Sequence, residues 1–188
     1  VNEKTADGQL LADPEIVTKF MQKFVSFNKP NQAIKIFNSF KSLESPLLKN
    51  ELLLAVAHLP ANSRELRMNR ILAIWNSVIK PATPTASSYA SLIEAIGISG
   101  NTSQLHTIWG KEIPADFKKD NKLMESYLFT VLRFNSKATF DSVANKLPEK
   151  IESIDLINAG LFKMVKNKVS RDKFEAFYSP QFMKSRAP

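Results

Sequence analysis

The side chains that could carry out chemistry are limited in kind. The chain of 188 residues has two histidines, His58 and His106, 18 Asp plus Glu and no cysteine. Thiol catalysis, disulfides, iron–sulfur clusters and cysteine-bound zinc are therefore excluded. The sequence also contains no HExxH motif, nucleophile elbow or P-loop. We predict that the protein is not an enzyme, with no catalytic residue, no metal and no cofactor.

One segment, Gly97-Ile98-Ser99-Gly100, is superficially similar to a nucleophile elbow. An elbow lies at a turn from a strand to a helix, whereas this segment follows a helical pattern of apolar residues. Glycine readily adopts the left-handed conformation that ends many helices. We therefore predict that Gly100 is a helix C-cap.

Positive charge is the second chemical feature. The chain has 26 Lys plus Arg against 18 Asp plus Glu, a net charge of +8. Such a charge attracts polyanions, and contacts between basic side chains and phosphates make binding depend on salt. For any single lysine, a solvated helix face is the alternative interpretation. The candidates for contact with an RNA backbone are Lys19, Lys23, Lys122, Arg133, Lys163 and Lys166.

Helices must position these side chains. Only 5 residues are glycine, against about 7% in an average chain, which disfavours tight hairpins and Gly-rich loops. Hydrophobic residues make up 44% of the chain, enough for a buried core. The longest aliphatic run, residues 52–57, is much shorter than the roughly 20 residues that a membrane-spanning helix needs. We predict an all-α protein without a membrane span.

A helical hairpin is the unit of this pattern. In residues 14–43, apolar residues recur at spacings of three and four on both sides of the polar break Asn28-Lys29-Pro30-Asn31. The same pattern of two amphipathic helices recurs along the chain with a period of about 35 residues. The second unit is longer because it contains the polar residues 60–69 between its two helices. The predicted units start near residues 14, 46, 86, 121 and 155.

These units predict the domain organisation. Residues 1–12 are a lead-in, residues 13–180 form a single helical-repeat domain and residues 181–188 are a tail. Phe37, Trp75 and Trp109 fall at equivalent positions of the second helices, where stacked repeats bury large side chains, so we expect them in the core. A helical bundle without repeats is the alternative.

Two segments carry a family resemblance. They are Asn31-Gln32-Ala33-Ile34-Lys35-Ile36-Phe37, and Tyr89-Ala90-Ser91-Leu92-Ile93 followed by Gly100-Asn101. With a period of about 35 residues, residues 13–180 resemble the pentatricopeptide repeat; tetratricopeptide repeats are the nearest alternative. The resemblance, which is to fungal mitochondrial members, implies a right-handed α-solenoid of about five helix-turn-helix units.

The resemblance also implies single-stranded RNA binding, with about one base read by each repeat. In the family, the fifth residue of the first helix and the last residue before the next unit read the base. On this sequence, the implied base-reading pairs are Thr18 with Ser45, Asn50 with Thr85, and Ala90 with Asp120. Glu125 falls at the fifth position of the fourth unit and does not fit, because it would place an anion against a polyanion.

The function that the resemblance implies is organellar RNA stability, processing or translation activation. The implied location is the mitochondrial matrix, with single-stranded RNA, a mitochondrial transcript or rRNA, as the partner, together with the mitochondrial ribosome or other proteins. Because the chain begins at Val1, we expect its targeting segment to lie outside it. The alternative is a protein-binding helical-repeat scaffold in a mitochondrial assembly or ribosome-associated complex.

Overall fold

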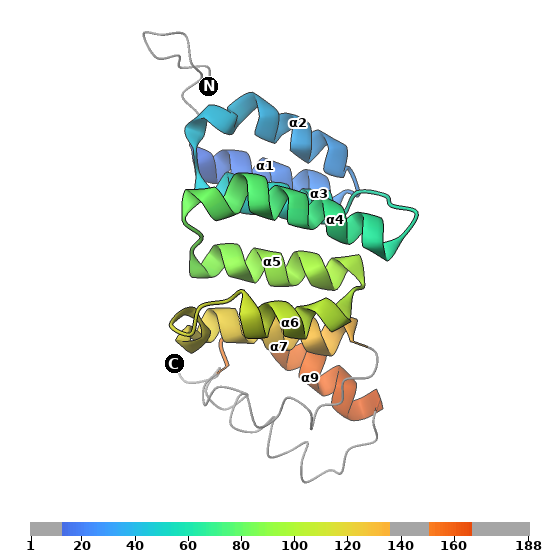
Figure 1. Ribbon diagram of the computed structural model, residues 1–188. Helices are drawn as coiled ribbons and strands as arrows, with labels where there is room; N and C mark the ends of the chain where they lie inside the picture. Colours follow the sequence, from blue (N-terminus) through green and yellow to red (C-terminus); the bar gives the residue numbers. More distant parts are fainter. Residues whose placement is uncertain (1–12, 136–150, 167–188) are drawn as a thin grey trace, which may run out of the picture. The chain divides into compact units, whose positions relative to one another are not determined.

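The computed structural model describes residues 13–135 and 151–166. All regular elements in these two ranges are helical, which confirms the predicted all-α class (Figure 1). None of the helices described there is long and apolar enough to span a membrane. The predicted lead-in, the tail, and the second helices of the fourth and fifth units lie outside the described residues.

The chain divides into two compact units, residues 1–101 and residues 102–188. The helices of the first unit are α1 (Pro14–Ser26), α2 (Pro30–Phe40), η1 (Lys41–Leu43), α3 (Pro46–Ala57), α4 (Arg64–Ile74), the π-helical turn η2 (Trp75–Ile79), η3 (Lys80–Ala82) and α5 (Ala86–Ser99). The described helices of the second unit are α6 (Thr102–Lys111), η4 (Phe117–Lys119), α7 (Asn121–Phe134) and α9 (Ile154–Lys166).

Local capping chemistry sets several helix ends. Helices α1, α2 and α3 begin with proline, whose missing N–H has no partner at this position in any helix. The Asp13 carboxylate accepts a hydrogen bond from the Glu15 N–H at 2.8 Å, and Thr85 forms a capping box with Ser88. Gly100 ends α5 with φ of 75°, which confirms the predicted C-cap.

The start of α4 differs from the prediction. Residues 64–69, expected within a polar insertion, are helical, because the Ser63 hydroxyl accepts a hydrogen bond from the Leu66 N–H at 3.0 Å and caps the helix. Arg67 and Arg70 then donate to the carbonyls of Ile98 and Pro60, at 3.3 and 2.8 Å. The polar composition of this segment therefore reflects a solvated helix instead of a loop.

Helix α3 is the centre of the first unit. It packs against α1, α2, α4 and α5, and its buried side chains point in all directions around its axis: Leu48, Asn50, Glu51, Leu52, Leu53, Ala55, Val56 and Ala57. Phe37 and Trp75 are buried around it, as predicted, and the Trp75 ring lies 5.3 Å from that of Tyr89. A helix that is apolar on every side needs neighbours on every side.

The second unit has an aromatic cluster between α6 and α7. Trp109 is half-buried and stacks on Tyr127, with ring centroids 4.1 Å apart and an angle of 17°. The Tyr127 hydroxyl and His106 Nδ1 are hydrogen-bonded at 2.7 Å, and burial raises the pKa of this hydroxyl. His106 thus contributes to packing. In the part of the chain that the structure describes, no group of three His, Asp or Glu could hold a metal ion.

A buried carboxylate holds α9 beside α7. Glu125, on α7, is 4% exposed, and its two carboxylate oxygens accept hydrogen bonds from the N–H groups of Glu152 and Ser153, both at 2.8 Å. These N–H groups lie just before α9, where no preceding helical turn offers an acceptor. Glu125 therefore faces the protein interior, where it has a structural partner.

A second buried carboxyl lies on α3. Glu51 is 5% exposed, and burial raises its pKa from 4.5 to about 7; the nearby Glu94 carboxylate adds to this effect, and a hydrogen bond from Gln22 opposes it. Between these two pH values the folded chain keeps a proton that the unfolded chain releases. The free energy of unfolding therefore falls as pH rises through this range.

We expect Glu51→Gln to raise the melting temperature at about pH 8, where the wild-type carboxyl must be buried while charged, and to leave it almost unchanged at about pH 4. Thermal unfolding followed by circular dichroism at both pH values measures this difference. The control is Glu65→Gln on the exposed surface of α4, which should show no pH-dependent gain. An equal gain for Glu51→Gln at both pH values would contradict the interpretation.

We expect Glu125→Ala to lower the free energy of unfolding by about 3 kcal/mol, because it removes two charge-assisted hydrogen bonds and leaves two N–H groups without acceptors. Glu125→Gln keeps one acceptor oxygen, and its loss should be intermediate. Urea unfolding measures the energies, and hydrogen exchange at Glu152 and Ser153 shows whether the opening is local. The idea fails if exchange at these two amides is the same in Glu125→Ala as in the wild type.

Candidate nucleic-acid interface

The candidate interface is a cavity of about 440 Å³ between α7 and α9 in the second unit. The two helices pack directly against each other, and Glu125 fixes the start of α9. The cavity combines aromatic rings, basic side chains and short polar groups. Its lining residues are Phe129, Leu132, Arg133, Phe134, Asp155, Asn158, Ala159, Phe162, Lys163 and Lys166.

Arg133 is the central cation of this cavity. Its guanidinium lies 5.5 Å from the ring centroid of Phe129 and 5.1 Å from that of Phe134, distances at which a cation is attracted to an aromatic face. The side chain remains exposed. The two rings therefore restrain Arg133 while its N–H groups stay accessible to an anion.

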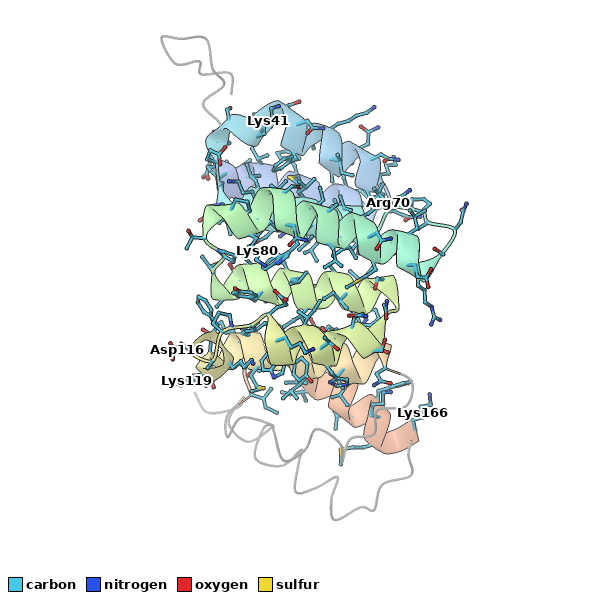
Figure 2. The ribbon with its side chains drawn as sticks, in the orientation of Figure 1. Lys41, Arg70, Lys80, Asp116, Lys119 and Lys166 are labelled. Atoms are coloured by element: carbon cyan, nitrogen blue, oxygen red, sulfur yellow. The ribbon has the colours of Figure 1, made fainter. Side chains whose placement is uncertain are left out.

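The two lysines of α9 differ in their surroundings. Lys163 is 5% exposed, and its Nζ donates to the backbone carbonyl of Asn135, the C-cap of α7, at 3.0 Å. Burial lowers its pKa, and the neighbouring Lys166 adds to this effect. Lys166 lies on the last turn of α9 and is exposed (Figure 2). Lys163 therefore joins α9 to the end of α7, whereas Lys166 is accessible to a ligand.

Six lining residues are not among the sequence candidates, and three of them, Phe129, Asn158 and Phe162, could contact a ligand through a ring or an amide. Phe162 is 66% exposed, one turn after Asn158, whose amide is also exposed, and Phe129 lies one turn before Arg133. The available signal was the helical spacing of an aromatic beside a polar or basic residue on α7 and on α9. Counted from the predicted unit start at residue 155, the fifth residue is Ala159, which also lines the cavity. Because α9 begins at Ile154, its fifth residue is Asn158.

The other predicted backbone contacts lie elsewhere. Lys19 and Lys23 are exposed on α1 of the first unit, and the Lys23 ammonium lies 5.2 Å from the ring centroid of Phe27. Lys122 is exposed on the first turn of α7 and does not line the cavity. The structure therefore brings Arg133, Lys163 and Lys166 together, and leaves the other three basic candidates outside this site.

Two of the predicted base-reading residues are buried and bonded within the protein. Thr18 is 8% exposed, and its hydroxyl donates to the Pro14 carbonyl at 2.7 Å. Asn50 is 6% exposed, and its Nδ2 donates to the Ser87 hydroxyl at 3.3 Å, while its Oδ1 has no partner among the described residues. Thr18 is thus bonded within its own helix, α1, and Asn50 is bonded to α5, the first helix of the next predicted unit.

The remaining base-reading candidates lie at helix starts or on a helix surface. Ser45, Thr85 and Asp120 are the N-cap residues of α3, α5 and α7. Thr85 and Asp120 accept hydrogen bonds from the N–H groups of Ser88 and Leu123. Ser45 is buried, and Ala90 is half-buried on α5. The base-reading role of all six candidates stays a prediction.

Comparison with known proteins shows two family models that match the chain. Residues 2–111 match the family model described as the MSC6 N-terminal domain, and residues 127–188 match the MSC6 C-terminal domain. No solved structure matches the chain.

The relatives are fungal proteins named meiotic sister-chromatid recombination protein 6, mitochondrial. The protein of Saccharomyces cerevisiae is 40% identical over 168 residues, which are 87% of this chain and 24% of the relative. That of Candida glabrata is 34% identical over 188 residues, 92% of this chain and 26% of the relative. That of Kluyveromyces lactis is 31% identical over 180 residues, 91% of this chain and 25% of the relative.

The chain thus spans about a quarter of the length of the curated relatives it matches. Its relatives are mitochondrial proteins, and the predicted mitochondrial localisation is confirmed. Because the MSC6 N-terminal domain alone matches more than half of the sequence, the chain belongs to the MSC6 family.

Proposed function

We propose that the chain is a single-stranded RNA-binding module of the mitochondrial matrix that acts in the stability, processing or translation of a mitochondrial RNA. The observation that carries this proposal is the cavity between α7 and α9, where exposed cations lie beside aromatic rings. Proteins that hold single strands combine these same elements, a basic surface for phosphates and aromatic rings on which bases stack.

The base and the phosphate of a nucleotide each have a matching group in the cavity. Phe162 presents an exposed ring for stacking, and Arg133 and Lys166 are accessible to phosphate oxygens. The Asn158 amide can donate to and accept from a base edge. The volume of about 440 Å³ is within the range of roughly 300–1,000 Å³ for sites that hold small ligands.

The repeat architecture is part of the same proposal, as a right-handed α-solenoid of the pentatricopeptide type. In the first unit, α3 packs against α1 and α5, and in the second unit α7 packs against α9. First helices are thus neighbours within each unit, as stacked hairpins require. A side chain at the fifth position links two first helices in each unit, Asn50 to Ser87 and Glu125 to the residues before α9.

We expect Phe162→Ala to weaken the binding of single-stranded RNA by about tenfold, because stacking on an aromatic ring contributes about 1–3 kcal/mol per base. The measurement is fluorescence anisotropy with labelled oligouridine and with an RNA of mixed sequence. Phe20→Ala, which removes an exposed ring from the first unit, is the matched control and should leave the affinity unchanged. Equal losses for the two variants would contradict the cavity as the site.

We also expect Arg133→Gln/Lys166→Gln to reduce the slope of log affinity against log salt concentration by about 1.4, since each phosphate contact to a single strand contributes about 0.7. Lys35→Gln/Lys41→Gln removes the same charge from α2 and its end (Lys41 in Figure 2) and should leave the slope unchanged. The name of the relatives refers to recombination, so single-stranded DNA of the same sequence is included. Tighter binding of this DNA would contradict RNA as the ligand, and the absence of binding to either would favour a protein-binding scaffold.

A further inference from the structure

Helix α1 carries an exposed apolar and basic stripe that neither the fold nor the proposed RNA site uses. Ile16 and Phe20 are 53% and 60% exposed and lie one helical turn apart on one face. Phe27, the C-cap of α1, is 61% exposed, and its ring centroid lies 5.2 Å from the Lys23 ammonium. The opposite face is buried through Val17, Thr18 and Met21. We call the exposed face the α1 ridge and define it by Ile16, Lys19, Phe20, Lys23 and Phe27.

The two lysines give the α1 ridge a positive charge. Lys19 and Lys23 are exposed, and within the described part of the chain neither forms an ion pair with a carboxylate. The acidic groups of this helix, Asp13 and Glu15, both lie at its start, and the Asp13 carboxylate caps the Glu15 N–H. An anionic partner would therefore complement the central and C-terminal turns of the ridge.

Helix α2 indicates that the ridge is not the stacking surface of another hairpin. A stacked hairpin would cover both α1 and α2, yet the outward side chains of α2 are polar: Asn31, Gln32, Lys35, Asn38 and Ser39. Helix α3 shows the composition of a helix that is covered on several sides, since its buried residues surround its axis. The α1 ridge is instead a narrow apolar strip between polar neighbours.

The shape and chemistry of the ridge fit a lipid surface. Single-stranded nucleic acids bind in grooves, and a helix-binding protein needs a complementary groove of its own, whereas a bilayer interface accepts a convex ridge. Apolar side chains enter the acyl boundary, and long lysine side chains reach the phosphates around them. We propose that the α1 ridge docks the first unit peripherally onto a bilayer that contains anionic phospholipids.

The test is flotation of the full chain with vesicles of phosphatidylcholine, with and without phosphatidylglycerol. We expect binding to the anionic vesicles, much weaker binding to the neutral ones, and a loss of about tenfold or more for Lys19→Gln/Lys23→Gln, because each lysine near an anionic surface contributes about 1 kcal/mol. Ile16→Gln/Phe20→Gln should cause a similar loss while leaving thermal unfolding unchanged, because both side chains are exposed.

Two control variants separate the ridge from general effects. Lys35→Gln/Lys41→Gln removes the same charge from α2 and its end, and Phe162→Gln removes an exposed ring from the second unit; both should float like the wild type. Absence of binding to anionic vesicles overturns the proposal, as does an equal loss in the controls. It is also overturned if the ridge variants lose RNA affinity instead, or if they dissociate a dimer in sedimentation, since the ridge would then serve RNA or a second copy of the chain.

Discussion

Backbone N–H groups at the start of a helix have no acceptor within that helix, and in the second unit Glu125 supplies the acceptors for the residues before α9. The carboxylate is on α7, so the same two hydrogen bonds that satisfy these groups also set the register of α9 against α7. At the other end of the pair, Lys163 donates to the backbone carbonyl of Asn135, the C-cap of α7. These contacts fix the distance between Arg133 and Phe162, and the cavity depends on them.

Charge is placed differently in the two units, although the net charge of +8 describes only the whole chain. In the first unit, Glu51 is buried on α3, and repulsion from Glu94 on α5 helps to keep its carboxyl protonated. In the second unit, exposed Arg133 and Lys166 line a cavity with aromatic walls. Exposed Arg133 and Lys166 are thus accessible to a polyanion, whereas the Glu51 carboxyl is buried away from the surface.

Local chemistry was readable from the sequence. Pro14, Pro46 and Gly100 mark helix ends through their own backbone preferences, and the prediction of these ends needed no knowledge of the neighbours. The polar residues around Ser63 predict a loop, and their composition alone does not identify Ser63 as the cap of α4. The burial of Thr18, Asn50 and Glu125 could not be predicted from the sequence. It depends on which face of one first helix contacts the next first helix, and helical spacing alone does not specify that face.

The same contacts limit what the cavity could discriminate. Arg133 lies close to two aromatic rings, which restrain it while it stays exposed, and a phosphate that it would bind carries no base identity. Stacking on Phe162 is open to every base, since each has an aromatic face. Among the described lining residues, Asn158 is the one side-chain amide, and a single amide distinguishes base edges only weakly. In the proposed RNA complex, this cavity would supply affinity and salt dependence, and selective reading of bases would have to come from contacts beyond it.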